Sequence, residues 1–266
     1  MAKHKQIKNR IGRLSLEDSI QSTYKKGINM KRYGNLYEKI YDIENLKLAH
    51  KNAKKGKGWY KEVKEVDDGI DYYLLKLQKM LINKTYKTSE YEIFLKNDGI
   101  KRREIYKLPY FPDRICQWAI LQIIEPYLTR TFTHDTYSAI PNRGIHLALQ
   151  KIKKDIYLNS DKDLYCLKID ARKYYPSINH NILKSKYRKL FKDKDLLWLL
   201  DEIIDSTEGN TGIPIGNYLS QYSGNFYFSS FDHWIKEEKQ VKYYYRYMDD
   251  IVLINEDKNK LKSLLN

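Results

Sequence analysis

The sequence predicts an α+β fold in which helices pack against a small antiparallel sheet. Two runs rich in β-branched and aromatic residues, Val241–Arg246 and Ile251–Ile254, flank a short polar turn, which is the pattern of a strand, a turn and a strand. A third apolar run, Leu164–Ile169, has the same character. Most of the remaining chain carries apolar residues at helical spacing. With 266 residues the chain can bury a substantial core in one or two domains.

The first half of the chain predicts helices and one hairpin. Apolar residues at helical spacing predict helices over 36–60 and 68–82. Tyr91–Leu95 and Lys101–Ile105 are expected to be strands, joined by a polar turn that contains a glycine. The stretch 114–128 is apolar nearly all round and predicts a buried helix.

In the second half, the strand Leu164–Ile169 delivers Asp170 at its carboxyl end, a position that often faces a ligand in sheets. The remaining elements expected there are helices at about 145–156, 180–191, 194–206 and 218–234, with a glycine-rich loop at 209–216.

The composition favours a polyanionic partner. The net charge is +15, and 25 Tyr accompany 49 Lys and Arg, a mixture that suits phosphate contacts and base stacking. A genome rich in A and T would also raise Lys and Tyr. Residues 1–13 contain five basic residues and no acid, so we expect a flexible arm that orders on a phosphate backbone.

Several classes of protein are disfavoured. Cys116 and Cys166 have no pairing or metal-ligand spacing, and the six His are scattered, so we expect a reducing compartment and no zinc site. No apolar run approaches the ~20 residues of a membrane span. The start of the chain lacks the apolar segment of a secretory signal. We therefore expect a cytoplasmic protein with no membrane partner.

Three acidic residues carry the predicted chemistry. Asp249 and Asp250 are adjacent carboxylates at the tip of a predicted hairpin, where they repel each other unless a cation lies between them. Alone, such a pair is more often a structural turn. With Asp170 as a third carboxylate, the set could hold two Mg²⁺ ions roughly 4 Å apart, with Mn²⁺ as a substitute. Such ions would activate a 3′-hydroxyl and neutralise a leaving pyrophosphate.

Three segments follow the order of the motifs of reverse transcriptases: Leu167–Ile178, the glycine-rich segment after it, and Tyr247–Asp250. The chain resembles these enzymes over roughly residues 35–255. The resemblance implies a right-hand polymerase with fingers and palm, RNA template, DNA primer and dNTPs as ligands. It further implies that Asp170, Asp249 and Asp250 bind the metal with the Ala171 carbonyl, and that Tyr175 excludes the ribonucleotide 2′-hydroxyl.

In this family a Lys and an Arg flanking a finger hairpin hold the triphosphate. Lys96 and Arg103 match best, and Lys101 and Arg102 are alternatives that would otherwise contact the nucleic-acid backbone; a solvated hairpin is the plainer alternative. Arg114 lies in an Asp-Arg-x-x-Gln element similar to the family's and is a further nucleotide-binding candidate, although Asp113–Arg114 could also form a structural ion pair.

One subgroup is indicated by Ile215, Gly216 and Gln221, because group II intron and retroviral enzymes usually have Gln before this Gly and Pro after the Ser. The combination resembles diversity-generating retroelement enzymes, as does the segment that contains Arg143, a candidate for backbone contact. This implies copying of a template-repeat RNA with errors at adenines, linked to Ile215, in a bacterial or phage-encoded element with a small basic accessory protein.

The expected domains are a basic arm with a helical extension (1–60), fingers (61–160) and palm (161–266) with a helical insertion at about 179–210. Because the sequence stops at Asn266, soon after the hairpin, we expect the thumb to be absent. The alternatives are a defence-associated or other group II-like reverse transcriptase, and a catalytically weak RNA-binding fragment. Neighbouring genes would separate the first of these from the retroelement enzyme.

Overall fold

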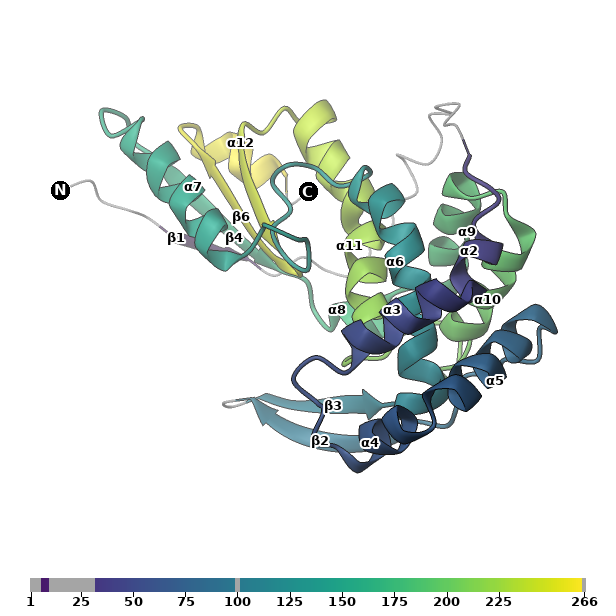
Figure 1. Ribbon diagram of the computed structural model, residues 1–266. Coiled ribbons are helices and arrows are strands. Elements are labelled where there is room, and N and C mark those ends of the chain that lie inside the picture. Colours follow the sequence, from purple (N-terminus) through teal and green to yellow (C-terminus); the bar gives the residue numbers. More distant parts are fainter. Residues whose placement is uncertain (1–5, 10–31, 99–100, 265–266) are drawn as a thin grey trace. The chain divides into compact units, whose positions relative to one another are not determined.

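The computed structural model describes residues 6–9, 32–98 and 101–264, which form helices, a four-stranded sheet and a two-stranded sheet (Figure 1). The mixed helix-and-sheet class predicted from the sequence is confirmed. The chain forms two compact units. The first comprises Met1–Asn29, Leu128–Tyr174 and Gly224–Asn266, and the second comprises Met30–Tyr127 and Tyr175–Ser223. None of the helices in the described ranges is long and apolar enough to cross a bilayer.

The sheet of the first unit has the strand order β1–β4–β6–β5. The predicted strands are confirmed as β4 (Tyr165–Asp170), β5 (Tyr243–Tyr247) and β6 (Asp250–Asn255), and β6 pairs antiparallel with both neighbours. The fourth strand, β1 (Gln6–Asn9), pairs parallel with β4. The expectation of a flexible arm is therefore wrong for these four residues, and the sheet is mixed; arm residues 1–5 and 10–13 lie outside the described part.

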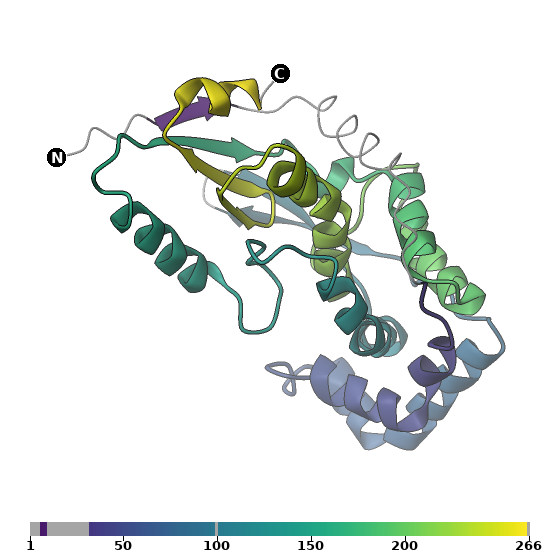
Figure 2. The same cartoon turned by 90° about the horizontal axis from the view of Figure 1, so that it is seen from above.

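Alternate residues of this sheet face opposite sides. Leu167 and Leu253 are fully buried on one side. On the other side, helix α7 (Ile145–Tyr157) packs its apolar residues against Tyr245 and Ile254, and Figure 1 shows it running along the sheet. The short helix α12 (Lys258–Ser263) packs beside β6 and β4 (Figure 2). The carboxyl end of β4, an inner strand, therefore lies at the same end of the sheet as the start of β6.

The second unit begins with helices that the sequence predicted only in part. The single helix expected over 36–60 is two helices, α2 (Tyr37–Tyr41) and α3 (Ile43–Ala53). Asp42 separates them because its carboxylate accepts the N–H groups of Glu44 and Asn45 and so caps α3. The helix expected over 68–82 is α5 (Ile70–Ile82), and α4 (Lys61–Asp68) precedes it across Gly69.

The rest of the second unit follows the predicted pattern. The hairpin is confirmed as β2 (Glu92–Asp98) paired antiparallel with β3 (Lys101–Lys107), and its turn residues 99–100 lie outside the described part. The buried helix is α6 (Ile115–Thr129), whose last two residues belong to the first unit. The other elements of this unit are the irregular turn Tyr110–Arg114 and the helices α9 (His180–Leu190) and α10 (Lys194–Ile204). Helices α8 (Tyr174–Ser177) and α11 (Tyr218–His233) are shared between the units, and the π-helical turn Trp234–Glu238 belongs to the first unit.

Candidate active site

The turn between β5 and β6 carries the two adjacent carboxylates. Tyr247 and Asp250 are paired across the strands, so the loop consists of Met248 and Asp249 alone. Met248 has a φ of 54°, a left-handed conformation that non-glycine residues rarely adopt. Positive φ at the first loop residue is typical of the type II′ turn, whose twist matches that of the flanking strands. The predicted position of Asp249 at a hairpin tip thus agrees with the structure.

The third carboxylate lies on the neighbouring strand, in register with the turn. Asp170 is the last residue of β4 and is the cross-strand partner of Asp250 on β6. The backbone N–H of Ala171 donates to the carbonyl of Asp249 at 3.4 Å, which joins the end of β4 to the turn. The structure therefore brings Asp170, Ala171, Asp249 and Asp250 together at one edge of the first unit's sheet.

A lysine lies beside this edge. The ammonium of Lys168 is 3.2 Å from a carboxylate oxygen of Asp250, and both side chains are about half exposed, at 45% and 53%. Pairs this exposed contribute little to stability, typically about 0.2–1 kcal/mol. Lys168 therefore acts mainly on the local charge, because it offsets part of the repulsion between the clustered carboxylates.

The donor set at this end of the sheet can be compared with the Mg²⁺ that the resemblance implies. It consists only of hard oxygen donors on two adjacent strands, which is the ligand chemistry that Mg²⁺ prefers. However, within residues 6–9, 32–98 and 101–264, no three His, Cys, Asp or Glu side chains are gathered closely enough to hold a metal ion. The residue types and the register fit the ion, whereas the side chains are not arranged around one.

Sequence reasoning missed Arg246, the residue whose side chain is hydrogen-bonded to the turn between β5 and β6. Arg246 on β5 is fully buried and forms a two-pronged ion pair with Asp232 of α11, with both N–O distances at 2.7 Å. A third nitrogen of the guanidinium donates to the carbonyl of Met248 at 2.9 Å. The available signal was the cation itself, since Arg inside an apolar strand requires a buried partner.

The hairpin β2–β3 of the second unit carries the predicted triphosphate-binding residues. The backbone pairs Lys96 with Arg103 and Asn97 with Arg102. The side chains of Lys96 and Arg102 are exposed, as contact with a ligand requires. The side chains of Arg103 and Lys101 lie outside the described part of the structure.

The glycine-rich loop is attached to the same hairpin. The carbonyl of Ile215 accepts the N–H of Tyr106 on β3 at 3.1 Å. Gly216 follows with a φ of +117°, and a side chain at this position would lie 3.4 Å from Ile105 and from the Tyr106 carbonyl. Glycine is therefore required here by backbone conformation. The loop places Ile215, which is half-buried, beside β3.

A cavity of about 630 Å³ lies next to this loop, within the second unit. Two predicted residues, Arg114 and Gly216, line it together. Its wall includes the stacked rings of Trp118 and Tyr218, whose centroids are 4.7 Å apart. Trp59, at its rim, is 72% exposed. Three lysines also line the cavity, Lys57, Lys61 and Lys107.

Exposed aromatic rings beside cations suit the bases and phosphates of a single strand. These aromatic residues were missed by sequence reasoning, although the basic, glycine-rich run before Trp59 and Tyr60 was a usable signal. Burial lowers the pKa of the Arg114 guanidinium, whose Nε donates to the carbonyl of Ala53 at 3.3 Å. The hydrogen bonds of the Asp113 carboxylate are to other residues than Arg114: it accepts from the hydroxyl of Tyr86 and from the N–H of Ser89.

The remaining predicted residues are Tyr175, Gln221 and Arg143. Tyr175 and Gln221, both half-buried, belong to the second unit. The Tyr175 carbonyl accepts the N–H of Ile213, which ties it to the glycine-rich loop. Arg143, in the first unit, donates to the carbonyls of Thr133 and Thr136 at 2.9 and 3.2 Å. These contacts hold the loop before α7, so Arg143 has a structural function whether or not it contacts nucleic acid.

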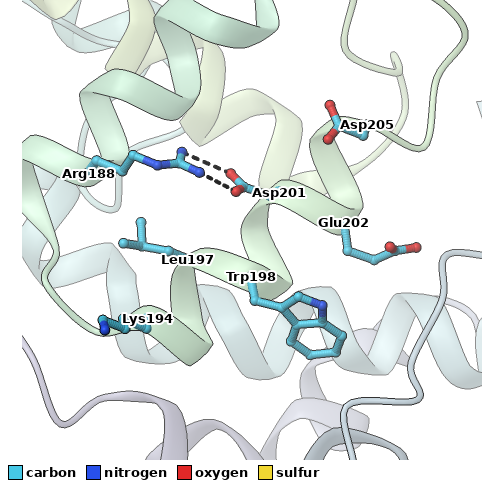
Figure 3. A pocket seen from close by; sticks show the side chains of 7 residues that line it. All are labelled: Arg188, Lys194, Leu197, Trp198, Asp201, Glu202 and Asp205. Atoms are coloured by element: carbon cyan, nitrogen blue, oxygen red, sulfur yellow. Dashed lines mark hydrogen bonds and ion pairs between the residues drawn. The ribbon is translucent and has the colours of Figure 1, made fainter.

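A second cavity, of about 480 Å³, lies on α9 and α10. Figure 3 shows Arg188 pointing at Asp201, with which it forms two hydrogen bonds, and the ring of Trp198 turned away from this pair. Asp205 at its rim is bonded to Lys184. Because these charges are paired with one another and no predicted residue lines the cavity, it is a surface hollow between two helices.

The sequence matches the family described as reverse transcriptase (RNA-dependent DNA polymerase) over residues 95–266, more than half of the chain. The chain belongs to the reverse transcriptase family. It is also similar to Protein YkfC of Escherichia coli (strain K12), with 24% identity over 139 residues that cover 49% of this chain and 36% of YkfC. The match thus spans little more than a third of that relative's length.

Proposed function

We propose that the protein is an RNA-directed DNA polymerase whose active site is the sheet edge formed by Asp170, Asp249 and Asp250. The observation that carries the proposal is the register of β4 and β6, which pairs Asp170 with Asp250 and joins Ala171 to Asp249 in a chain of the reverse transcriptase family. Carboxylates grouped in this way repel one another, and a bound cation would relieve that repulsion.

In this proposal Asp170, Asp249, Asp250 and the Ala171 carbonyl hold two Mg²⁺ ions, for which Mn²⁺ can substitute. When bound, these ions supply charge stabilisation to the attacking and leaving oxygens of the phosphoryl transfer. The role of Asp170, Asp249 and Asp250 would be to hold these ions at the end of the sheet. The ammonium of Lys168, 3.2 Å from a carboxylate oxygen of Asp250, offsets part of the negative charge of the site. The protein's own contribution is positioning and electrostatics, because phosphoryl transfer needs little covalent chemistry from side chains.

The second unit supplies nucleotide and template contacts. Lys96 and Arg103 are paired on the hairpin, as two cations that grip one triphosphate would be. Lys101 and Arg102 extend the charge toward the template backbone. The cavity lined by Arg114, Gly216 and aromatic rings offers stacking surfaces for unpaired bases. The net charge of +15 favours association with these polyanions.

The finer proposal is the diversity-generating subtype. It is supported by Ile215 and Gln221 around Gly216, and by the attachment of Ile215 to β3. An apolar residue there offers no hydrogen bond to a base pair, so mispairs opposite adenine are rejected less sharply. The template is then a template-repeat RNA, Tyr175 excludes ribonucleotides, and a small basic accessory protein assists. A defence-associated or other group II-like reverse transcriptase is the alternative.

Primer extension on an RNA template tests the polymerase. With Mg²⁺, dNTPs, cognate RNA and accessory protein supplied, Asp249→Ala should lower extension by about a thousand-fold or more, because metal-ion stabilisation is worth several kcal/mol. Asp163→Ala is the matched control, since Asp163 is an exposed carboxylate of the same unit placed outside the site. Equal extension by Asp249→Ala and the wild type would refute the proposal.

Sequencing the products tests the subtype. Ile215→Gln should lower misincorporation opposite template adenine and leave errors opposite the other three bases unchanged. Each template thus contains its own control. An adenine error rate that is low in the wild type, or unaltered in the variant, would favour the alternative enzyme.

A further inference from the structure

A buried cluster of charged side chains lies next to the β5–β6 turn of the first unit, and its main members are Arg246 and Asp232. Arg246 and Asp232 are both 0% exposed. Nε and Nη2 of Arg246 each donate to one carboxylate oxygen of Asp232 at 2.7 Å, and the guanidinium lies 4.9 Å from the centroid of the Phe228 ring. This is a bidentate ion pair with an aromatic ring over the cation.

The pair is fully supported by its surroundings. Asp232 also accepts the hydroxyls of Tyr244 and Thr136. Burial alone would lower the pKa of the Arg246 guanidinium, but the charge and hydrogen bonds of Asp232 outweigh burial and raise this pKa. The backbone of Arg246 is fixed as well, because its N–H donates to the Asp135 carbonyl at 2.9 Å. The ion pair with Asp232 and the backbone hydrogen bond to Asp135 therefore hold the Arg246 side chain in place.

One nitrogen of this fixed guanidinium reaches the turn. Nη1 donates to Asn225 and to the carbonyl of Met248, both at 2.9 Å. Met248 is the loop residue with a φ of 54°, and such backbone persists only where neighbours hold it. A buried ion pair gives no clear gain in stability over apolar residues of the same volume. An apolar pair would fill the space but would donate nothing to Met248.

We propose that Arg246 is a positioning residue: held by Asp232 and Asn225, it clamps the Met248 carbonyl and so fixes the turn that presents Asp249 and Asp250. The inference rests on the proposed function in one respect, namely that the turn presents metal ligands. The clamp itself is a property of the turn and can be measured without catalysis.

The test separates folding from positioning. Arg246→Met alone leaves the Asp232 carboxylate buried and unpaired, so we expect it to unfold the unit. The informative variant is the neutral double substitution Arg246→Met with Asp232→Asn, in which Asn still accepts from Tyr244. Tyr244→Phe is the matched control, because it removes a bond from the same cluster and leaves the donation to Met248 intact.

Three readouts are needed: thermal unfolding, amide hydrogen exchange of the peptide containing residues 247–250, and Mn²⁺ affinity by calorimetry with primer–template present. The folded double variant should exchange this peptide faster than the wild type and lose about 10- to 100-fold in Mn²⁺ affinity, as expected for a group that orients metal ligands. In extension assays the Mg²⁺ requirement should rise while the KM for dNTP stays constant. Tyr244→Phe should change neither exchange nor affinity.

A folded double variant with wild-type exchange and wild-type Mn²⁺ affinity would overturn the proposal. If the double variant does not fold, Arg246→Lys decides in the same readouts, because it keeps the charge beside Asp232 and loses the planar fork. A wild type that binds no Mn²⁺ would refute the proposed function instead, and the exchange of the turn would still test the clamp.

Discussion

The replacement of Gly216 by Ala tests whether the glycine-rich loop has the conformation and the role described above. Gly216 has a φ of +117°, far from the conformations that an alanine adopts without strain. An added Cβ would lie 3.4 Å from Ile105 Cγ2 and 3.4 Å from the carbonyl oxygen of Tyr106, close to van der Waals contact. The penalty therefore comes mainly from the backbone.

Strained backbone of this kind costs about 1–3 kcal/mol. We expect Gly216→Ala to lose this much free energy of unfolding in urea titrations. Two other glycines of the same unit provide controls. Gly209 has a φ of +84° with open space around it, so Gly209→Ala should show a comparable loss from strain alone; Gly58 has neither strain nor neighbours, and Gly58→Ala should be neutral or slightly stabilising.

Function should separate the two strained variants. Gly216 lines the cavity beside β3, so Gly216→Ala should also raise the KM for dNTP or weaken template binding, whereas Gly209→Ala should leave both unchanged. Stability of Gly216→Ala equal to that of the wild type would refute the backbone conformation. Equal effects of Gly216→Ala and Gly209→Ala on substrate use would refute a role for Gly216 in binding.

Two further predictions concern the second unit. The carboxylate of Asp193 accepts the N–H groups of Leu36 and Tyr37, and although burial opposes ionisation, these and other backbone hydrogen bonds lower its pKa below 3.8. Its stabilisation is therefore complete above pH 3.8 and is lost as the pH falls through the lower folded value. Asp193→Asn should cost up to about 1 kcal/mol at pH 7 in urea titrations, because solvent screens this partly exposed carboxylate, and progressively less in acid; a constant difference at all pH values would contradict this. Trp59→Ala should weaken binding of unstructured RNA, measured by fluorescence anisotropy, by about 1–3 kcal/mol, the usual worth of one stacked base. The exposed ring of Tyr72 on α5 is the control, and equal losses for Trp59→Ala and Tyr72→Ala would exclude stacking in the cavity.

The parts of the fold that follow from local pattern were predictable. The Tyr247–Asp250 turn between two β-rich runs, and Asp170 at the end of an apolar strand, need only the alternation and turn chemistry of nearby residues. Helix α6 was equally clear because nearly all its residues are apolar.

The features that sequence reasoning missed depend on contacts between distant segments. The pairing of β1 with β4 joins residues far apart in the chain, and the four residues of β1, with Ile7 as the only apolar one, gave no strand pattern. The helix expected over 36–60 is broken because Asp42 caps α3, a local signal that outweighed apolar spacing. The partner of Arg246 lies on another element, and only the folded chain shows that it is Asp232.

Local sequence pattern does not determine the roles of the site residues in metal binding and fidelity. Strand pairing supports grouping Asp170 with Asp250, yet the metal they are proposed to hold was inferred from ligand chemistry and resemblance. The same holds for Ile215, whose attachment to β3 is structural and whose effect on fidelity is a proposal.

Measuring Mn²⁺ binding in the presence of an RNA template, a DNA primer and a dNTP shows whether the three carboxylates form one divalent-metal site. The primer should be chain-terminated so that binding is measured without turnover. We expect Asp170→Ala and Asp249→Ala each to abolish the same Mn²⁺ binding and Asp163→Ala to keep it. Wild-type Mn²⁺ affinity in the folded Asp170→Ala variant would show that Asp170 is not part of a shared metal site.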